Sequence, residues 1–186
     1  MSVSANGHLN IPEGTITIVS GSWEEWGVDK TTVKTVTFPA TVTNIGENAF
    51  RGCILLVTVT IPDSLTSIED YAFHKCSSLV TLTIPDSVTS IGPFAFYRCI
   101  LLVTVTIPEG VTCIRYCAFA DCFSLKTVTI QGDFTKIGDW AFEECSSLTT
   151  LTIPDSVTSI GYRAFYRCGE LHTLLIQPAA AATGTD

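Results

Sequence analysis

The chain has 186 residues, of which 46% are hydrophobic and 15% are charged, and its formal net charge is −8. This apolar content excludes a disordered chain, and no apolar run approaches the roughly 20 residues of a membrane-spanning helix. The acidic balance argues against nucleic acid as a partner, and against docking on or inserting into anionic lipid, because phosphate binding needs clustered lysine and arginine.

Residues 1–32 are predicted to form a degenerate repeat and a cap. The start, MSVSANGHLN, lacks the basic and apolar segments of a signal peptide, which predicts an intracellular protein or one whose leader has been removed. Residues 9–18 (LNIPEGTITI) contain an Ile-Pro pair like the one in the later repeats. Trp23 and Trp26 are interpreted as cap residues that cover the first coil. A sugar-binding aromatic pair is the alternative.

Residues 33–170 consist of six successive units of 23 residues. In each unit, apolar residues at positions 4 and 6 alternate with threonine at positions 3 and 5, which is the pattern of a strand with one buried face. Proline at position 7 ends the strand in five units, and Gln131-Gly132 replaces it in the fifth. The six units begin at Val33, Leu56, Leu79, Leu102, Leu125 and Leu148.

The rest of each unit is predicted to be an extended segment and a short helical turn. Positions 10 and 13 are apolar, and positions 17 and 18 are Ala-Phe in all six units. The apolar spacing 13, 17, 18, 21 favours a helical turn. One such unit cannot close a core, so the units are predicted to stack into a solenoid with a continuous core. Residues 171–178 are a terminal partial repeat, and residues 179–186 are predicted to be a flexible tail.

Six of the eight cysteines recur at intervals of 23, which indicates a repeat position and not a disulfide framework. We expect them to be small, buried free thiols in successive coils. Cys113 and Cys117 lie outside this ladder and are interpreted as tolerated small residues, with a disulfide or metal pair as the alternative. The ladder consists of Cys53, Cys76, Cys99, Cys122, Cys145 and Cys168.

The unit pattern L-x-x-L-x-I-P-x-x-V-x-x-I-G-x-x-A-F-x-x-C-x-x closely resembles the BspA-like leucine-rich repeats over residues 33–178. The resemblance implies a right-handed, mainly β solenoid with one parallel sheet face. It also implies a secreted or cell-surface protein, because family members include bacterial surface proteins that bind host matrix components and mediate adhesion. The family has no common active site to transfer, and Glu69 and Arg115 replace the glycine at position 14.

Two outward-facing columns of threonine are the most unusual feature of the sequence. They predict an uncharged array of methyl and hydroxyl groups with strands about 4.8 Å apart, running about 29 Å over six units. We call these twelve side chains the threonine face. They are Thr35, Thr58, Thr81, Thr104, Thr127 and Thr150 at position 3, and Thr37, Thr60, Thr83, Thr106, Thr129 and Thr152 at position 5.

Several readings of the threonine face stay open. Threonine suits exposed strands and forms favourable cross-strand pairs, which is a purely structural explanation. The leading functional hypothesis is a protein or glycan recognition and adhesion scaffold, although interface hot spots are usually aromatic residues or arginine. Ice binding is the alternative, because flat Thr-x-Thr arrays resemble the faces of insect antifreeze proteins. A structural spacer within a longer surface protein is a third reading.

Enzyme chemistry is not predicted. His8, His74 and His172 are scattered, and no serine–histidine–aspartate order, metal motif or phosphate loop is present. The sequence therefore predicts no catalytic residues, no cofactor and no metal.

Overall fold

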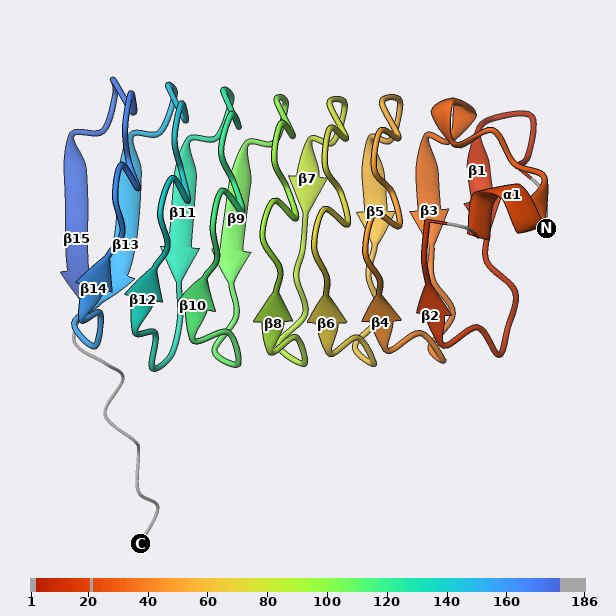
Figure 1. Cartoon of the computed structure of the whole chain (residues 1–186), viewed down its shortest axis with the longest axis horizontal. Coiled ribbons are helices and arrows are strands. Elements are labelled where there is room, and N and C mark those ends of the chain that lie inside the picture. Colours follow the sequence, from red (N-terminus) through yellow and green to blue (C-terminus); the bar gives the residue numbers. More distant parts are fainter. Residues whose placement is uncertain (1–2, 21, 178–186) are drawn as a thin grey trace, which may run out of the picture.

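The computed structural model describes residues 3–20 and 22–177. They form a solenoid in which each coil adds one strand to a long parallel sheet (Figure 1). Residue 178 and the predicted tail, residues 179–186, lie outside the described residues. Thr, Val and Ile form the strands because they fit an extended, half-buried surface. In sheet order the strands are β1 (His8–Asn10), β3 (Thr35–Thr37), β5 (Thr58–Thr60), β7 (Thr81–Leu82), β9 (Thr104–Ile107), β11 (Thr127–Ile130), β13 (Thr150–Pro154) and β15 (Thr173–Gln177).

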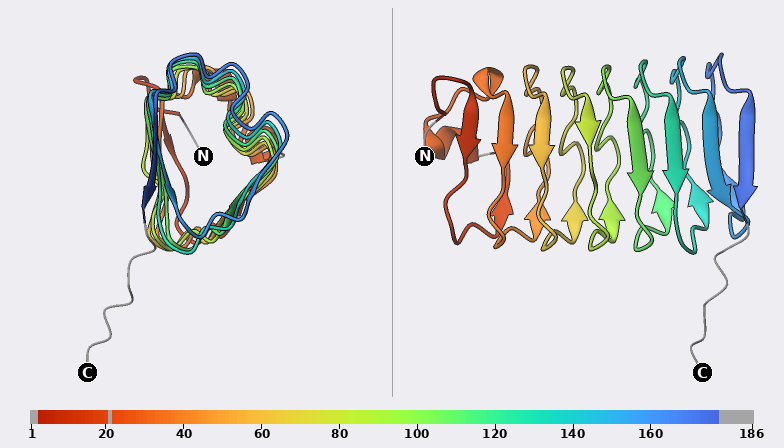
Figure 2. Two further views of the ribbon diagram at one scale, coloured as in Figure 1. Left: turned by 90° about the vertical axis from the view of Figure 1, so that its left-hand side faces the viewer. Right: turned by 180° about the vertical axis from the view of Figure 1, so that it is seen from behind.

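The extended segment of each coil forms a second wall of two-residue strands. This wall is divided into a four-stranded and a three-stranded parallel sheet. Seen end-on, the coils superimpose closely, and the solenoid axis is straight (Figure 2). The strands are β2 (Thr17–Ile18), β4 (Asn44–Ile45), β6 (Ser67–Ile68) and β8 (Ser90–Ile91), followed by β10 (Cys113–Ile114), β12 (Lys136–Ile137) and β14 (Ser159–Ile160).

Phenylalanine rings form the centre of the core, one ring per coil. From Phe50 to Phe165 their centroids are 5.1 to 5.6 Å apart, and the planes of neighbouring rings differ by 5° to 12°. Face-to-face stacking follows from the 23-residue repeat, because identical side chains in successive coils lie one strand spacing apart. The stacked rings are Phe50, Phe73, Phe96, Phe119, Phe142 and Phe165.

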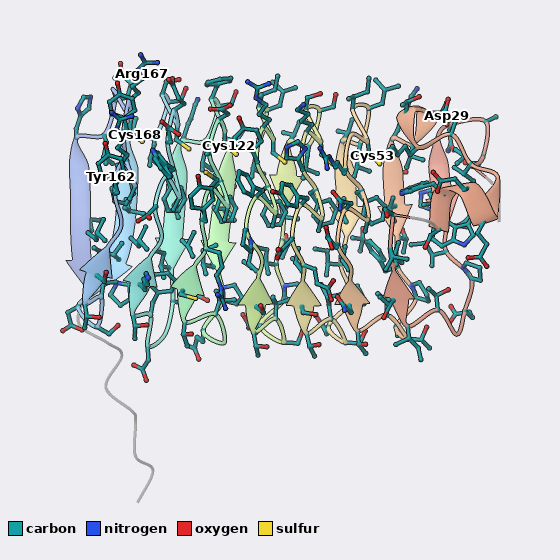
Figure 3. All side chains as sticks on the ribbon, in the orientation of Figure 1. Asp29, Cys53, Cys122, Tyr162, Arg167 and Cys168 are labelled. Carbon is teal, nitrogen blue, oxygen red and sulfur yellow. The ribbon has the colours of Figure 1, made fainter. Side chains whose placement is uncertain are left out.

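The cysteine ladder lies beside the phenylalanines, and its members are free thiols, as predicted. From Cys76 onward, each Sγ donates to the carbonyl of the phenylalanine 26 residues earlier, for example Cys99 to Phe73 at 3.3 Å. Burial raises the pKa of Cys53 and Cys122 to about 12. Cys168, labelled near the C-terminal end of the solenoid in Figure 3, is only half-buried. Cys113 and Cys117 are also free, so they do not form a disulfide.

The predicted helical turn is wrong in detail: this part of each coil is a series of hydrogen-bonded turns with no helix. Asn48 at position 16 and Gly52 at position 20 of the first coil have positive φ angles of 56° and 76°. The same two positions have positive φ in the next five coils. This alternation turns backbone groups along the solenoid axis, so that Phe50 N donates to Ala72 O of the next coil at 2.7 Å. We call residues 46–53 and their equivalents the turn segment.

The two ends of the solenoid differ. At the N-terminal end, helix α1 (Ser22–Trp26) places Trp23 against Phe50 edge to face, at 5.4 Å, and Trp23 Nε1 donates to Ala49 O. Trp23 is therefore buried, which does not suit a sugar platform. A short 3-10 helix, η1 (Lys30–Thr32), leads into the first repeat. At the other end Ile160 is 51% exposed, whereas its equivalent Ile137 is fully buried.

Candidate binding face

The long sheet brings the threonine face together as two columns. Strand pairing places Thr35, Thr58 and Thr81 in register, and the same column continues through Thr104, Thr127 and Thr150. In the second column, Thr37 is in register with Thr60, and Thr106 with Thr129. Thr83 lies one residue beyond β7. Alternation places the intervening Val or Leu of each strand in the core.

Most of the threonine face is open to solvent. Seven of its twelve side chains are exposed and four are half-buried. Thr152 is the exception, because it is only 8% exposed. Its register partner on β15 is Leu175, a larger side chain in place of threonine. The open part of the face is therefore centred on β5, β7 and β9.

Among the described residues, one hydroxyl of the threonine face is hydrogen-bonded within the fold. Thr35 Oγ1 lies 2.7 Å from His8 Nδ1. Within the described residues, the other eleven hydroxyls of the face make no hydrogen bond to the protein. Apart from the hydroxyl of Thr152, which is buried, they are available to water or to a ligand, each as one donor and one acceptor group.

A third threonine column, at position 11 of each unit, shows the contrast. Thr66 Oγ1 donates to Thr43 O at 3.0 Å, and Thr89 Oγ1 to Thr66 O at 3.3 Å. Thr135 and Thr158 repeat the same contact with the preceding coil. These hydroxyls link neighbouring coils, so the position 11 column has a structural role that the threonine face lacks.

Residues beyond the twelve extend both columns. The first column begins at His8 and ends at Thr173, and the second runs from Asn10 to Leu175. These residues lie outside the six complete units, which begin at Val33, so the repeat pattern of complete units does not include them. Thr173 could have been found, since it is position 3 of the truncated seventh unit.

The face carries no charged side chain and no aromatic ring in its twelve positions. It therefore suits a neutral ligand rich in hydroxyl groups or water. No group of three or more His, Cys, Asp or Glu that could hold a metal ion occurs in residues 3–20 and 22–177. Among the same residues, no helix is long and apolar enough to cross a membrane.

Comparisons with known proteins identify the repeat. The family model for the BspA-type leucine-rich repeat region matches residues 28–85 and 66–184, with six copies. The crystal structure of a T. pallidum leucine-rich repeat protein has a TM-score of 0.81 and 31% sequence identity. The alignment covers 89% of this chain and 78% of the T. pallidum chain.

A leucine-rich repeat protein from Eubacterium ventriosum ATCC 27560 is similar in fold, with a TM-score of 0.55 and 19% identity. This chain covers 53% of that protein, and 89% of this chain is aligned. A search of curated proteins finds no match. The family model covers most of the repeats, so the chain belongs to the BspA-type leucine-rich repeat family.

Proposed function

We propose that this chain is a non-catalytic recognition and adhesion scaffold that binds its ligand on the threonine face. The observation that carries the proposal is the set of eleven hydroxyls that make no hydrogen bond within the described residues. A face that served only the fold would be expected to use its hydroxyls as the position 11 column does, between neighbouring coils.

A neutral glycan fits this surface better than a protein. Each threonine offers a methyl group for the apolar side of a sugar ring and a hydroxyl for the sugar hydroxyls. Protein interfaces are usually centred on tyrosine, tryptophan or arginine, and the twelve positions hold none of these. Adhesion to a polysaccharide surface would then arise from many weak contacts along the two columns.

Ice is the second candidate ligand, favoured by the straightness of the solenoid. Curvature would prevent a long array from matching a flat crystal plane, and the axis is straight (Figure 2). The threonine columns are in register over successive strands about 4.8 Å apart. A spacer role, the third reading, predicts no ligand on this face.

One pair of assays separates the three functions. Thermal hysteresis and ice-crystal shaping report ice binding, and co-sedimentation with crystalline cellulose or chitin reports binding to a neutral glycan. The test variant is Thr83→Tyr/Thr106→Tyr, which puts two bulky side chains on the open part of the face. We expect it to abolish whichever binding the native protein shows.

The control is Thr43→Tyr/Thr112→Tyr, which changes two exposed threonines on the other wall. It should keep the binding of the native protein. Equal loss in both variants would place the ligand elsewhere. If the native protein shows neither hysteresis nor glycan binding, the threonine columns have only a structural role in the strands, and the spacer function is favoured.

A further inference from the structure

A second unusual surface lies along the edge where the chain leaves each turn segment and enters the long sheet, at the top of Figure 1. Large apolar side chains lie along this edge in the first, third and fourth coils, and Val57 continues it in the second. Leu55 is 43% exposed and Leu101 is 46% exposed. We call the surface the aliphatic edge. It consists of Ile54, Leu55, Val57, Val80, Ile100, Leu101, Val103 and Phe123.

Backbone hydrogen bonds show that these residues are neighbours. Val80 N donates to Val57 O, and Val103 N donates to Val80 O, both at 3.2 Å. Val57 N in turn donates to Lys34 O, and Lys126 N to Val103 O, each at 2.8 Å. Three valines therefore form a column with a lysine at each end. Over four coils the aliphatic edge runs about 14 Å.

The fold does not require apolar residues at this edge. Ser77 and Ser78 of the second unit occupy the positions of Ile54 and Leu55, and Ser146-Ser147 do so in the fifth. Those coils still add their strands to the long sheet, and their Ala-Phe pairs and ladder cysteines are buried as in the other central coils. Isoleucine, leucine and phenylalanine at exposed turns are poorly hydrated and gain no packing within the fold. Apolar side chains gathered there, along the valine column and on both sides of Ser77 and Ser78, therefore indicate an interaction surface.

Basic residues flank the aliphatic edge on both sides. Arg51, Lys75 and Arg98 are exposed at the ends of the first three turn segments, and Lys34 and Lys126 are exposed on the sheet side. These are five of the ten Lys and Arg in a chain with eighteen Asp and Glu. Asp121 is the carboxylate in the fourth turn segment, and it pairs with Arg98 at 2.9 Å. Glu47, Glu69 and Asp70 lie at the other end of the first two turn segments. With Arg98 paired, four cations that form no ion pair among the described residues remain beside the edge, so the edge is basic although the chain is acidic.

We propose that the aliphatic edge docks on the surface of an anionic lipid bilayer, with the apolar tips inserted among the acyl chains and the cations beside the headgroups. Apolar residues at the interface together with basic flanks are the combination that binds peripheral proteins to anionic membranes. Net charge alone argues against such docking, but it averages over the whole chain, and half of the ten Lys and Arg flank this edge.

A protein partner fits the edge less well. The residues favoured at protein hot spots are tyrosine, tryptophan and arginine, whereas leucine and valine are under-represented. All five tyrosines of the chain lie on the turn segments, where Tyr162 and Tyr166 pack against Arg163 at 5.2 and 4.6 Å. Arg167, labelled in Figure 3, lies on the same turn segment and pairs with Glu144. The aliphatic edge is instead a row of projecting turns, which suits a soft, flat surface.

The test is flotation of the full chain with phosphatidylcholine vesicles that contain or lack phosphatidylserine. We expect binding to the anionic vesicles that weakens at high salt. Leu55→Ser/Leu101→Ser introduces the serines found in other coils and should weaken binding about tenfold for each leucine removed. Lys75→Glu should weaken it about tenfold as well, because each basic residue near an anionic surface contributes to binding.

Ile16→Ser is the control, because Ile16 is also apolar and is 61% exposed but precedes β2 on the opposite edge. It should bind like the native chain, and circular dichroism should show all variants folded. Absence of binding to anionic vesicles, or binding that the leucine substitutions leave unchanged, overturns the proposal. A dimer seen by light scattering that the leucine substitutions dissociate, without vesicle binding, would assign the edge to a second copy of the chain.

Discussion

The side chains of Phe73 and Phe96 stack face to face, with ring centroids 5.4 Å apart and planes 5° apart. Phe96 stacks in the same way on Phe119, at 5.1 Å. Each interior ring is thus covered by the coil before it and the coil after it. The core is continuous along the solenoid for this reason, and one ring contributes to the stability of three coils.

Replacing Phe96 by alanine should therefore strongly destabilise the fold. The substitution Phe96→Ala leaves a cavity in a fully buried column, and we expect it to lower the free energy of unfolding by about 3–5 kcal/mol. Urea denaturation followed by circular dichroism measures the change. Phe123→Ala is the control, because Phe123 is exposed and should cost less than about 1 kcal/mol. A loss under about 1 kcal/mol for Phe96→Ala would contradict the core assignment.

The repeat made most of the fold predictable. The Thr-x-Thr pattern located the strands, and the fixed interval of 23 identified Cys99 and its equivalents as a ladder of free thiols. The turn segment was not predictable as a series of turns, because positive φ at Tyr71, Phe94 and Trp140 is unusual for aromatic residues. Their conformation is imposed by hydrogen bonds to the next coil, which is a tertiary effect.

The candidate face was predictable in position but not in chemistry. Alternation placed Thr81 and Thr104 outward, in register, on neighbouring strands. Which hydroxyls are used by the fold depends on the distance to the preceding coil, and Thr89 reaches a carbonyl oxygen whereas Thr104 does not. The basic edge was also not predictable, because residues such as Arg51 and Lys126 are far apart in the sequence and only the fold brings them to one edge.

The two kinds of threonine should differ in their contribution to stability. Thr89→Val removes a hydrogen bond to Thr66 O and should cost about 0.5–1.5 kcal/mol. Thr104→Val removes a hydroxyl that makes no hydrogen bond to the described residues, and we expect a change within about 0.5 kcal/mol. Both are measured by urea denaturation. An equal loss in the two variants would mean that the threonine face has a structural role.

Thiol labelling of the native protein should distinguish the ladder from the other cysteines. Labelling reagents attack the thiolate, and burial both shields Cys122 and raises its pKa to about 12. We expect Cys113, which is half-buried, to react with Ellman's reagent first, and Cys113→Ser to remove that fast phase. The five buried ladder thiols should react only after denaturant is added. A fast phase that disappears in Cys122→Ser would contradict their burial.

The pH dependence of stability should reveal His74. Its ring stacks on Tyr97 at 5.1 Å, and burial, together with the charges of Arg51, Lys75 and Arg98, lowers the pKa of His74 to about 4. In the unfolded chain the pKa is about 6.5, so the unfolded state binds a proton between these values while the folded state does not. Stability from this group is complete above pH 6.5 and is lost as the pH falls towards 4.

His74→Tyr, which places the residue of the next coil at this position, should make the decline between pH 6.5 and 4 less steep. Urea midpoints measured across this range test the prediction, and His172→Tyr, an exposed site, serves as the control. Parallel declines in the native protein and His74→Tyr would show that His74 does not contribute to the acid sensitivity of the fold.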